Sequence, residues 1–501
     1  MYSHGKLLEG EFLPKGSHRE WCDPEILQQI RRKSLANLRR EIEPVEQQTL
    51  ARLLSRWQGV SVPRKGLDAL LDAIEVLQGA SLLASDLERD ILPARVSGYE
   101  PGDLDTLMAA GEVVWTGVEQ VGDRDGRVAL YLTEALPLLA PPEEVATDRG
   151  PRSELAERIA RFLESSGASF FPAIREACSG GFPNEILDAL WELVWRGEVT
   201  NDTFQTVRSR LYPPDRKKER KEGPPGSPEF LRRLRARRSG EGVAAGRWSL
   251  LRSRKSGVVT PTEWSANIAQ QLLTRHGIVT RETALAEGLP GGYNLIYPAL
   301  RKMEESGFIR RGMFVAGLGA AQFAMPAAVD MLRSLRTTPA EPESVVLAAT
   351  DPANPYGSVL PWGQMESDNG EGDVSSHAMA RVSGAAVVLV NGQLAAFLRR
   401  KNPSIRVFLP DAEPERSQFA TKLARQLAEL AVHRQRNPRA GLLISTVNEI
   451  PARQHSFGRF LEEAGFADTA AGYHMRRVTS IVKPFDNEDD DADEQSATEM
   501  A

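Results

Sequence analysis

The sequence predicts a helix-rich α+β protein in which tandem winged-helix domains are followed by a small β-barrel-containing α+β domain. Two observations lead to this prediction. A pattern of helix, turn, second helix, glycine and β-prone run occurs three times, over residues 80–117, 168–202 and 277–314. After about Val345 the chain changes to β-prone runs, and Asn391-Gly392 gives a hairpin-turn signal between two of them.

Each repeat has the order of a winged-helix unit. A short turn with Gly or Pro joins the two helices, as helix-turn-helix units require. Gly111, Gly197 and Gly307 follow the second helices, where a left-handed residue commonly ends a helix. In the first copy Asp125-Gly126 separates two β-rich runs and predicts the hairpin of a wing. Because the same pattern occurs three times along the chain, a chance match to the winged-helix order is improbable.

The same patterns divide the chain into segments. We expect a partial winged-helix wing and a basic helical segment over 1–60, because KLLEGEF is typical of a wing whose own helices are missing. A chain that begins inside a domain is expected to be a gene fragment or the product of a split gene. The other expected segments are winged helices over 61–142, 150–212 and 247–338, a basic disordered linker over 213–246, a barrel-like α+β domain over 345–478 and an acidic disordered tail over 479–501.

Charge is distributed unevenly along the chain. The net charge is −6, yet the stretch from Arg208 to Lys255 holds 16 Lys and Arg against 5 Asp and Glu. From Asp486 to the end there are eight acidic residues and no basic ones. This asymmetry indicates a basic nucleic-acid surface and a solvated acidic tail, with a merely soluble linker as the alternative for the basic run.

Composition excludes several function classes. Two cysteines, Cys22 and Cys178, are too few for a disulfide framework or a thiolate zinc cluster, and no histidine pair has metal-binding spacing. Because the P-loop motif is absent, no cofactor is expected in this chain, and ATP and Mg²⁺ are expected only through a separate motor. No apolar stretch approaches the ~20 residues that cross a membrane, and no apolar signal core opens the chain. A cytoplasmic protein without a membrane partner is therefore expected.

Basic and aromatic side chains gather in the third repeat. In a winged helix the second helix approaches a groove and the wing touches phosphates, while Tyr offers a stacking face to an unpaired base. We expect DNA contacts here, with protein–protein packing as the alternative. The first repeat has acidic residues at its second helix, so it is expected to be structural. The expected nucleic-acid-binding residues are Arg281, Tyr293, Arg301, Lys302, Arg310 and Arg311, together with Arg399 and Arg400.

One carboxylate stands out as a candidate catalyst. Asp351 follows an apolar run and precedes Pro352 and Pro355, with Tyr356 and Trp362 close in sequence. A carboxylate beside aromatic rings could stabilise a developing sugar cation and position water, as base excision requires. The alternative is an Asp that fixes a turn by accepting hydrogen bonds from backbone amides.

Long segments of the chain resemble a known family. They include LPARVSGYEPGDLDTLMAAGEVVW, GRWSLL, VTRETALAEGLPGGYNLIYPALRKMEESGFIRRGMF and ATDPANPYGSVLPW, and the resemblance extends from Gly5 to about Arg477. These segments resemble the C-terminal region of the bacterial large helicase-related proteins, Lhr. That resemblance implies tandem winged helices and a barrel behind an ATP-driven 3′-to-5′ DNA helicase motor, with uracil excision in some members. The two RecA-like motor domains have no counterpart in this sequence. An essential acid near the family's C-terminus would make Asp486 a second catalytic candidate.

Three hypotheses about function follow. The leading one is a DNA-binding C-terminal module of an Lhr-type repair helicase, which holds single-stranded or forked DNA beside a motor chain and has no ATPase of its own. The first alternative is a monofunctional, uracil-type DNA glycosylase that uses a carboxylate and no metal. The second is an assembly module whose winged helices form a homo-oligomer. Alkali cleavage of uracil-containing DNA is expected only for the glycosylase. A steep salt dependence of DNA binding is expected for the DNA-binding module and not for the assembly module.

Overall fold

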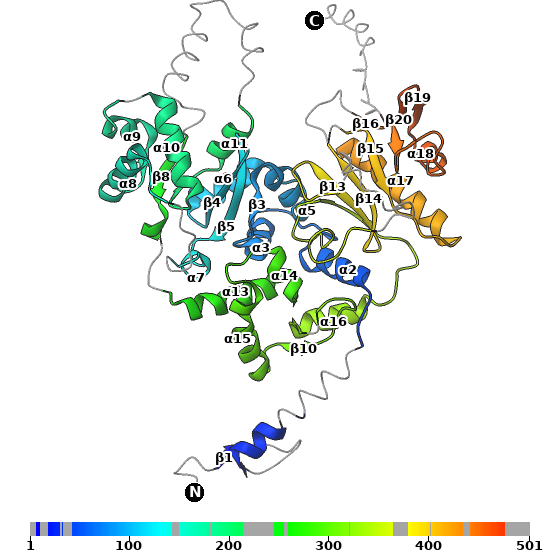
Figure 1. Ribbon diagram of the computed structural model, residues 1–501, viewed down its shortest axis with the longest axis horizontal. Helices are drawn as coiled ribbons and strands as arrows, with labels where there is room; N and C mark the ends of the chain where they lie inside the picture. Colours follow the sequence, from blue (N-terminus) through cyan, green and yellow to red (C-terminus); the bar gives the residue numbers. More distant parts are fainter. Residues whose placement is uncertain are drawn as a thin grey trace, which may run out of the picture.

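The computed structural model of the chain is drawn in Figure 1. It describes residues 7–10, 19–30, 33, 43–142, 150–180, 182–213, 245–254, 259–319, 321–363, 379–400, 402–433 and 441–475. Asp486 and the acidic tail therefore lie outside the described residues, as does nearly all of the expected linker. At the N-terminal end β1 (Leu8–Gly10) pairs antiparallel with β2 (Glu20–Cys22), which agrees with the expected wing hairpin.

The first winged-helix unit follows the predicted order. Gly111 ends its second helix with a φ of 83°, as the repeat predicts. Its strands form a three-stranded sheet in the order β3-β5-β4. The elements are α3 (Leu67–Leu77), β3 (Leu82–Leu83), α4 (Ala84–Asp86), the π-helical η2 (Leu87–Ile91), α5 (Leu92–Arg95), α6 (Pro101–Ala110), β4 (Val113–Val121), β5 (Asp125–Leu132) and α7 (Leu136–Leu139).

The second unit includes a strand that we expected elsewhere. Residues 247–250 were expected to open the third winged helix, but they form β8 between β6 and β7, with Trp248 opposite Ser169 and Ser249 opposite Thr200. The expected linker is therefore an insertion within this unit's sheet. The elements are α8 (Glu154–Ser166), β6 (Ser169–Phe170), α9 (Phe171–Ala177), α10 (Pro183–Trp195), β7 (Val199–Asn201), α11 (Gln205–Leu211), β8 (Arg247–Leu250) and η4 (Leu251–Arg254).

The third unit recruits a helix from the N-terminal segment. Val45 forms a parallel bridge with Val315, and α2 (Gln47–Trp57) packs on α16, so the end of the expected 1–60 segment belongs here structurally. The sheet order is β10-β11-β9. The elements are α13 (Pro261–His276), β9 (Ile278–Val279), α14 (Arg281–Ala286), α15 (Gly292–Glu305), β10 (Arg310–Gly312), β11 (Gln322–Ala324) and α16 (Pro326–Ser334).

Within the described residues, the last part of the chain contains two sheets and two helices. A six-stranded sheet has the order β12-β13-β14-β15-β17-β18, and a three-stranded sheet has the order β16-β20-β19. Asn391 and Gly392 have positive φ in the predicted turn between β13 and β14. The elements are β12 (Ser344–Ala348), β13 (Ala385–Val390), β14 (Gln393–Arg399), β15 (Ser404–Val407), α17 (Glu415–His433), β16 (Leu442–Ile444), β17 (Thr446–Val447), β18 (Ile450–Pro451), α18 (Gly458–Glu463), β19 (Ala467–Thr469) and β20 (Gly472–Met475).

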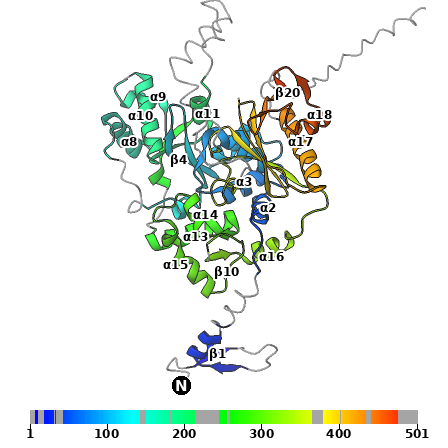
Figure 2. The same ribbon diagram turned by 45° about the vertical axis from the view of Figure 1, so that its right-hand side comes forward.

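The larger sheet is open, so the described residues do not close into the expected barrel. Its outer strands β12 and β18 each pair with one neighbour. Helices cover both faces of this six-stranded sheet. Val387 and Leu389 of β13 pack into the cluster that contains α2 and α16, whereas Val388 and Val390 pack into the cluster that contains α17. Figures 1 and 2 show α2 and α17 beside this sheet. Because helices bury both faces, the strands reach a dry core without closing on themselves. Among the described helices, none is long and apolar enough to cross a membrane.

Candidate functional site: a cavity between the winged helices

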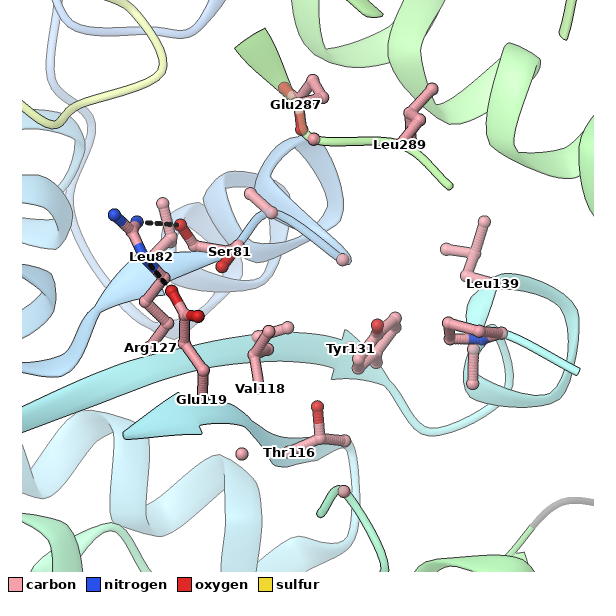
Figure 3. Close-up of a pocket in the computed structure, with 18 of the residues that line it drawn as sticks. Ser81, Leu82, Thr116, Val118, Glu119, Arg127, Tyr131, Leu139, Glu287 and Leu289 are labelled. Carbon is pink, nitrogen blue, oxygen red and sulfur yellow. Dashed lines mark hydrogen bonds and ion pairs between the residues drawn. The ribbon is translucent and has the colours of Figure 1, made fainter. Parts of the chain in front are cut away.

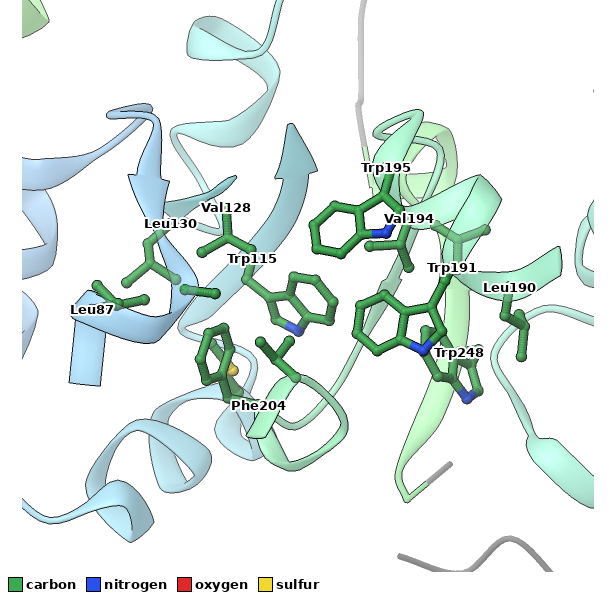
Figure 4. Packing of buried hydrophobic residues seen from close by; sticks show 14 of the residues in the cluster. Leu87, Trp115, Val128, Leu130, Leu190, Trp191, Val194, Trp195, Phe204 and Trp248 are labelled. Carbon is green, nitrogen blue, oxygen red and sulfur yellow. The ribbon is translucent and has the colours of Figure 1, made fainter. Parts of the chain in front are cut away.

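The wing of the first unit is buried against the second unit. Trp115 of β4 lies with its ring centroid 6.5 Å from Trp191 of α10 and 5.8 Å from Phe204, and Figure 4 shows these rings packed between the two units. The Thr200 hydroxyl donates to the Trp115 carbonyl at 2.6 Å. A Cβ on Gly117 would lie 2.3 Å from the Val194 carbonyl oxygen. This wing is therefore an interdomain contact and not a free phosphate-binding surface.

The acidic second helix of the first unit joins the same interface. The Asp105 carboxylate accepts hydrogen bonds from the Thr203 hydroxyl at 2.8 Å and from the Arg208 guanidinium at 2.6 Å. Burial opposes its charge, but the hydrogen bonds from Arg208 and Thr203 outweigh burial and hold the pKa of Asp105 below its usual value. Arg208 also pairs with Glu88 at 2.7 Å. These contacts agree with the structural role expected for the acidic helix.

The expected basic residues of the third unit occupy two kinds of position. Arg281 at the start of α14 and Lys302 on α15 are exposed to solvent. Arg301 is also exposed and pairs with Glu305 one turn on, at 3.0 Å. Arg310 and Arg311 are half-buried on β10, and the Arg311 guanidinium lies 5.7 Å from the centre of the Phe323 ring. The structure thus brings these five cations to one winged-helix unit.

Three of the expected nucleic-acid-binding residues differ from the others. Tyr293 is half-buried, donates its hydroxyl to the Ala321 carbonyl at 2.8 Å and packs 5.7 Å from the Tyr297 ring, so part of this side chain is engaged within the unit. Arg399 is the last residue of a different element, β14, and Arg400 follows it. The Arg399 guanidinium lies 6.0 Å from the Phe397 ring centre, and burial together with Arg89 lowers the pKa of the exposed Arg400.

Asp351 is fully buried. Its two carboxylate oxygens accept from the Arg95 guanidinium at 2.9 Å and 2.7 Å, and the Ala353 amide donates to the same carboxylate at 2.8 Å. The Asp351 side chain is 0% exposed, and that of Arg95 is 1% exposed. A carboxylate with both oxygens engaged and no exposed face cannot reach a substrate, so this geometry favours the turn-fixing alternative over catalysis. The partner Arg95 had no signal in the local sequence.

The three winged helices and the loop after β12 enclose a cavity of about 1250 Å³. The first wing contributes Thr116, Val118 and Tyr131, and α7 contributes Leu139. Across the cavity lie Glu287 and Leu289, which follow α14 (Figure 3). Sequence reasoning missed this cavity because its walls come from segments far apart in the chain. The volume exceeds the ~300–1000 Å³ of an ordinary small-molecule pocket, so it has room for a nucleotide with its sugar and phosphates.

Charged groups on the cavity wall are held by one another. Arg127 of β5 pairs with Glu119 of β4 at 2.8 Å (Figure 3). Glu287 accepts from Arg275 at 2.5 Å and contacts His276 at 2.6 Å. Burial opposes the Glu287 charge, but the positive charge of Arg275 and the hydrogen bond from His276 outweigh it and lower the pKa of Glu287 to about 2. The carboxylate is therefore ionised at neutral pH.

Arg381 holds the loop that contains Asp351 in place. Its guanidinium donates to the backbone carbonyls of Asn354 at 2.7 Å and Asp351 at 3.1 Å, and it reaches the cavity wall. Burial lowers its pKa to about 10, which still leaves it charged at neutral pH. Within the described ranges, no group of three or more His, Cys, Asp and Glu side chains is arranged to hold a metal ion.

The fold and the cavity define a protein of tandem winged helices that surround a central cavity and pack against an open, helix-covered sheet. Residues 45–133 and 258–344 match two families described as winged-helix domains of the large helicase-related protein, the third and the fourth respectively. The resemblance found in the sequence is therefore confirmed: the chain is related to the large helicase-related proteins and corresponds to their C-terminal region without the motor.

Two relatives and one solved structure are similar to the chain. A Mycolicibacterium smegmatis protein named Lhr helicase/probable uracil glycosylase is 38% identical over 426 residues, which cover 82% of this chain and 27% of that protein. The Escherichia coli Lhr helicase/uracil glycosylase is 33% identical over 485 residues, which cover 90% of this chain and 30% of that protein. The chain thus spans less than a third of either relative. The Streptomyces sahachiroi DNA glycosylase AlkZ is similar with a TM-score of 0.45 at 15% identity, over 77% of this chain and 96% of that one.

Proposed function

We propose that this chain binds DNA and acts as the DNA-holding module of an Lhr-type repair helicase. The observation that carries the proposal is the group of exposed cations on α14 and α15, Arg281, Arg301 and Lys302, in a unit that matches an Lhr winged-helix domain. Cations on a second helix neutralise phosphates and hold the strand. We further propose single-stranded or forked DNA as the substrate and a helicase motor as a partner, since both relatives carry helicase in their names.

Fluorescence anisotropy with single-stranded, forked and duplex oligonucleotides tests this proposal. We expect binding that weakens steeply with salt, because each phosphate contact releases counterions. A flat salt dependence would reject phosphate binding and favour the assembly-module alternative, in which the winged helices contact a second copy of the chain. Sedimentation at the same salt concentrations measures that self-association directly.

A second candidate function is excision of a base from DNA, and the central cavity is the observation that favours it. Both relatives carry uracil glycosylase in their names. An enzyme that cleaves a base must first take it out of the stack into a pocket, and the cavity of about 1250 Å³ has the required room. For excision without a metal we propose a carboxylate as the catalyst. Of the acids that line the cavity, Glu198 and Glu287 are each held by two side chains. The candidates are therefore Glu119, paired with Arg127 alone, and Asp486 beyond the described residues.

Incubation with uracil-containing single-stranded DNA, followed by alkali, tests the second candidate. We expect strand cleavage at uracil and none on the matched thymine oligonucleotide. Asp486→Asn and Glu119→Gln each remove one carboxylate charge while keeping its shape. Loss of cleavage in one of them, with unchanged DNA affinity, identifies the acid. An absence of cleavage by the unaltered chain would reject excision and leave the DNA-holding function standing.

A further inference from the structure

Two hydroxyl groups face the cavity without a hydrogen-bond partner among the described residues. Thr116 is 9% exposed and Tyr131 is 6% exposed, and both line the cavity. They belong to the two antiparallel strands of the first wing, β4 and β5, on the face that also carries Val114 and Ala129. Figure 3 shows both hydroxyls directed to the same side, toward the space below Glu287 and Leu289. Because the fold uses neither hydroxyl, both are open to the cavity and available to a ligand there.

The Tyr131 ring is held firmly in this position. The Gly79 amide donates to the Leu130 carbonyl at 3.0 Å, and a Cβ on Gly79 would lie 3.4 Å from the Tyr131 ring. The ring therefore lies close to the backbone at Gly79, with little free space between them. Burial raises the pKa of Tyr131 to about 12, so its hydroxyl keeps its proton and stays a donor at neutral pH. The Thr116 hydroxyl can donate or accept.

The charge pattern of the wall favours a neutral ligand over a phosphate. Arg127 is paired with Glu119, Arg152 with Glu198 at 2.7 Å, and Arg196 with Glu198 at 2.9 Å. A phosphate at any of these three arginines would have to displace a carboxylate. Apolar side chains complete the wall beside the two hydroxyls, among them Val118, Leu139 and Leu289 (Figure 3). Apolar walls with a few fixed polar groups suit a flat, uncharged ring.

We propose that the cavity binds a single unstacked nucleobase and that Thr116 and Tyr131 read its edge. The Tyr131 hydroxyl donates to a ring carbonyl oxygen of the base, and the Thr116 hydroxyl accepts from the neighbouring ring N–H or donates to a second carbonyl. Uracil offers two carbonyls around one N–H and matches this arrangement. The proposal rests on base excision as the second proposed function and adds to it the two residues that determine which base is accepted. Both are binding residues, and neither carries out the bond cleavage.

Two conservative variants test the proposal. Tyr131→Phe and Thr116→Val each remove one hydroxyl and leave the rest of the side chain in place. Because neither hydroxyl has a partner among the described residues, we expect the thermal unfolding midpoint to stay within error of the unaltered chain. Tyr212→Phe and Thr106→Val serve as matched controls. Tyr212 is 55% exposed and Thr106 lies on α6, and both are outside the cavity lining.

Saturation-transfer NMR with free uracil measures base binding without any excision. We expect a signal from the unaltered chain and both controls, and a weaker one from each variant. In the alkali-cleavage assay we expect each variant to excise uracil about three- to tenfold more slowly, as the loss of one neutral hydrogen bond implies. The proposal is overturned if the unaltered chain gives no uracil signal, or if the double variant Thr116→Val/Tyr131→Phe gives the same signal. Uracil binding without strand cleavage would overturn the excision function alone and leave the base-binding site in place.

Discussion

Arg95 and Asp351 form a buried ion pair that joins the first winged helix to the loop after β12. The two guanidinium nitrogens meet the two carboxylate oxygens at 2.9 Å and 2.7 Å, across 256 positions of sequence. Arg95 also donates to the Gln58 side chain at 2.6 Å and to the Ile91 carbonyl at 2.9 Å. One arginine thus ties α5, the end of α2 and the 350–357 loop together, next to the wall of the cavity.

We expect Asp351→Asn to destabilise the fold, because it leaves the buried Arg95 charge uncompensated. Removing one partner of a buried pair costs about 3–5 kcal/mol, and chemical denaturation measures the loss. Glu305→Ala is the control, since it breaks only the exposed Arg301–Glu305 pair and is expected to change the stability little. Replacing both partners, as Arg95→Met with Asp351→Leu, should recover part of the stability. Lost excision with unaltered stability in Asp351→Asn would instead restore the catalytic interpretation.

Local chemistry made much of the fold predictable, whereas long-range contacts had no sequence signal. Gly111 and the Asn391-Gly392 turn were predictable because a left-handed conformation favours particular residues at a particular place. The pairing of Trp248 with Ser169 was not, because the two strands are separated by the basic insertion. The position of Asp351 was misleading for the same reason: its neighbours in sequence are aromatic, but its partner in space is Arg95.

In the candidate site, too, some residues could be predicted from the sequence and others could not. The cations of the third unit could be predicted, because winged-helix geometry fixes where the second helix and the wing lie. The direction of the Tyr293 side chain could not be predicted, because it depends on tertiary contacts, here with Tyr297 and Ala321. The cavity required three units and a distant loop to be placed together, so Thr116 and Tyr131 carried no recognisable pattern.

Arg310→Ala combined with Arg311→Ala is expected to weaken DNA binding about equally for all sequences. Both residues lie on β10 in the wing of the third unit, where side chains touch phosphates. Two lost contacts should flatten the slope of log affinity against log salt by about 1.8 on duplex DNA, at ~0.9 per phosphate. Arg453→Ala with Arg459→Ala, in the last α+β part, is the control and should leave the slope as it was. An unaltered slope in the β10 variant would place the DNA-binding surface outside this wing.

Gly117→Ala is expected to loosen the contact between the first and second winged helices. The added Cβ would lie 2.3 Å from the Val194 carbonyl oxygen, and a backbone atom cannot move aside as a flexible side chain does. Overpacking of this kind costs about 1–3 kcal/mol, and the fluorescence of the buried tryptophans, Trp115, Trp191 and Trp248, reports the loosening. Gly102→Ala has open space around its Cβ in helix α6 and should be neutral or slightly stabilising. Equal stability of the two variants would contradict the close contact.

The Glu287 carboxylate makes the fold sensitive to acid. Arg275 and His276 hold its pKa at about 2 against the opposing effect of burial, whereas in the unfolded chain its pKa is that of an ordinary Glu, about 4.3. Because the pKa is lower in the folded state, this carboxylate stabilises the fold at pH values above its pKa in the unfolded chain. That stabilisation is lost as the pH falls toward 2. We expect the contribution of this group to the free energy of unfolding to be constant above about pH 5 and to fall between pH 4.5 and 2, by on the order of 3 kcal/mol.

Glu287→Gln should be less stable at pH 7 and should lose less stability over that acid range, which urea denaturation at a series of pH values measures. Glu176→Gln is the control, because Glu176 is exposed on α9, away from Arg275 and His276. A parallel acid dependence in Glu287→Gln and the unaltered chain would show that other carboxylates govern the acid transition.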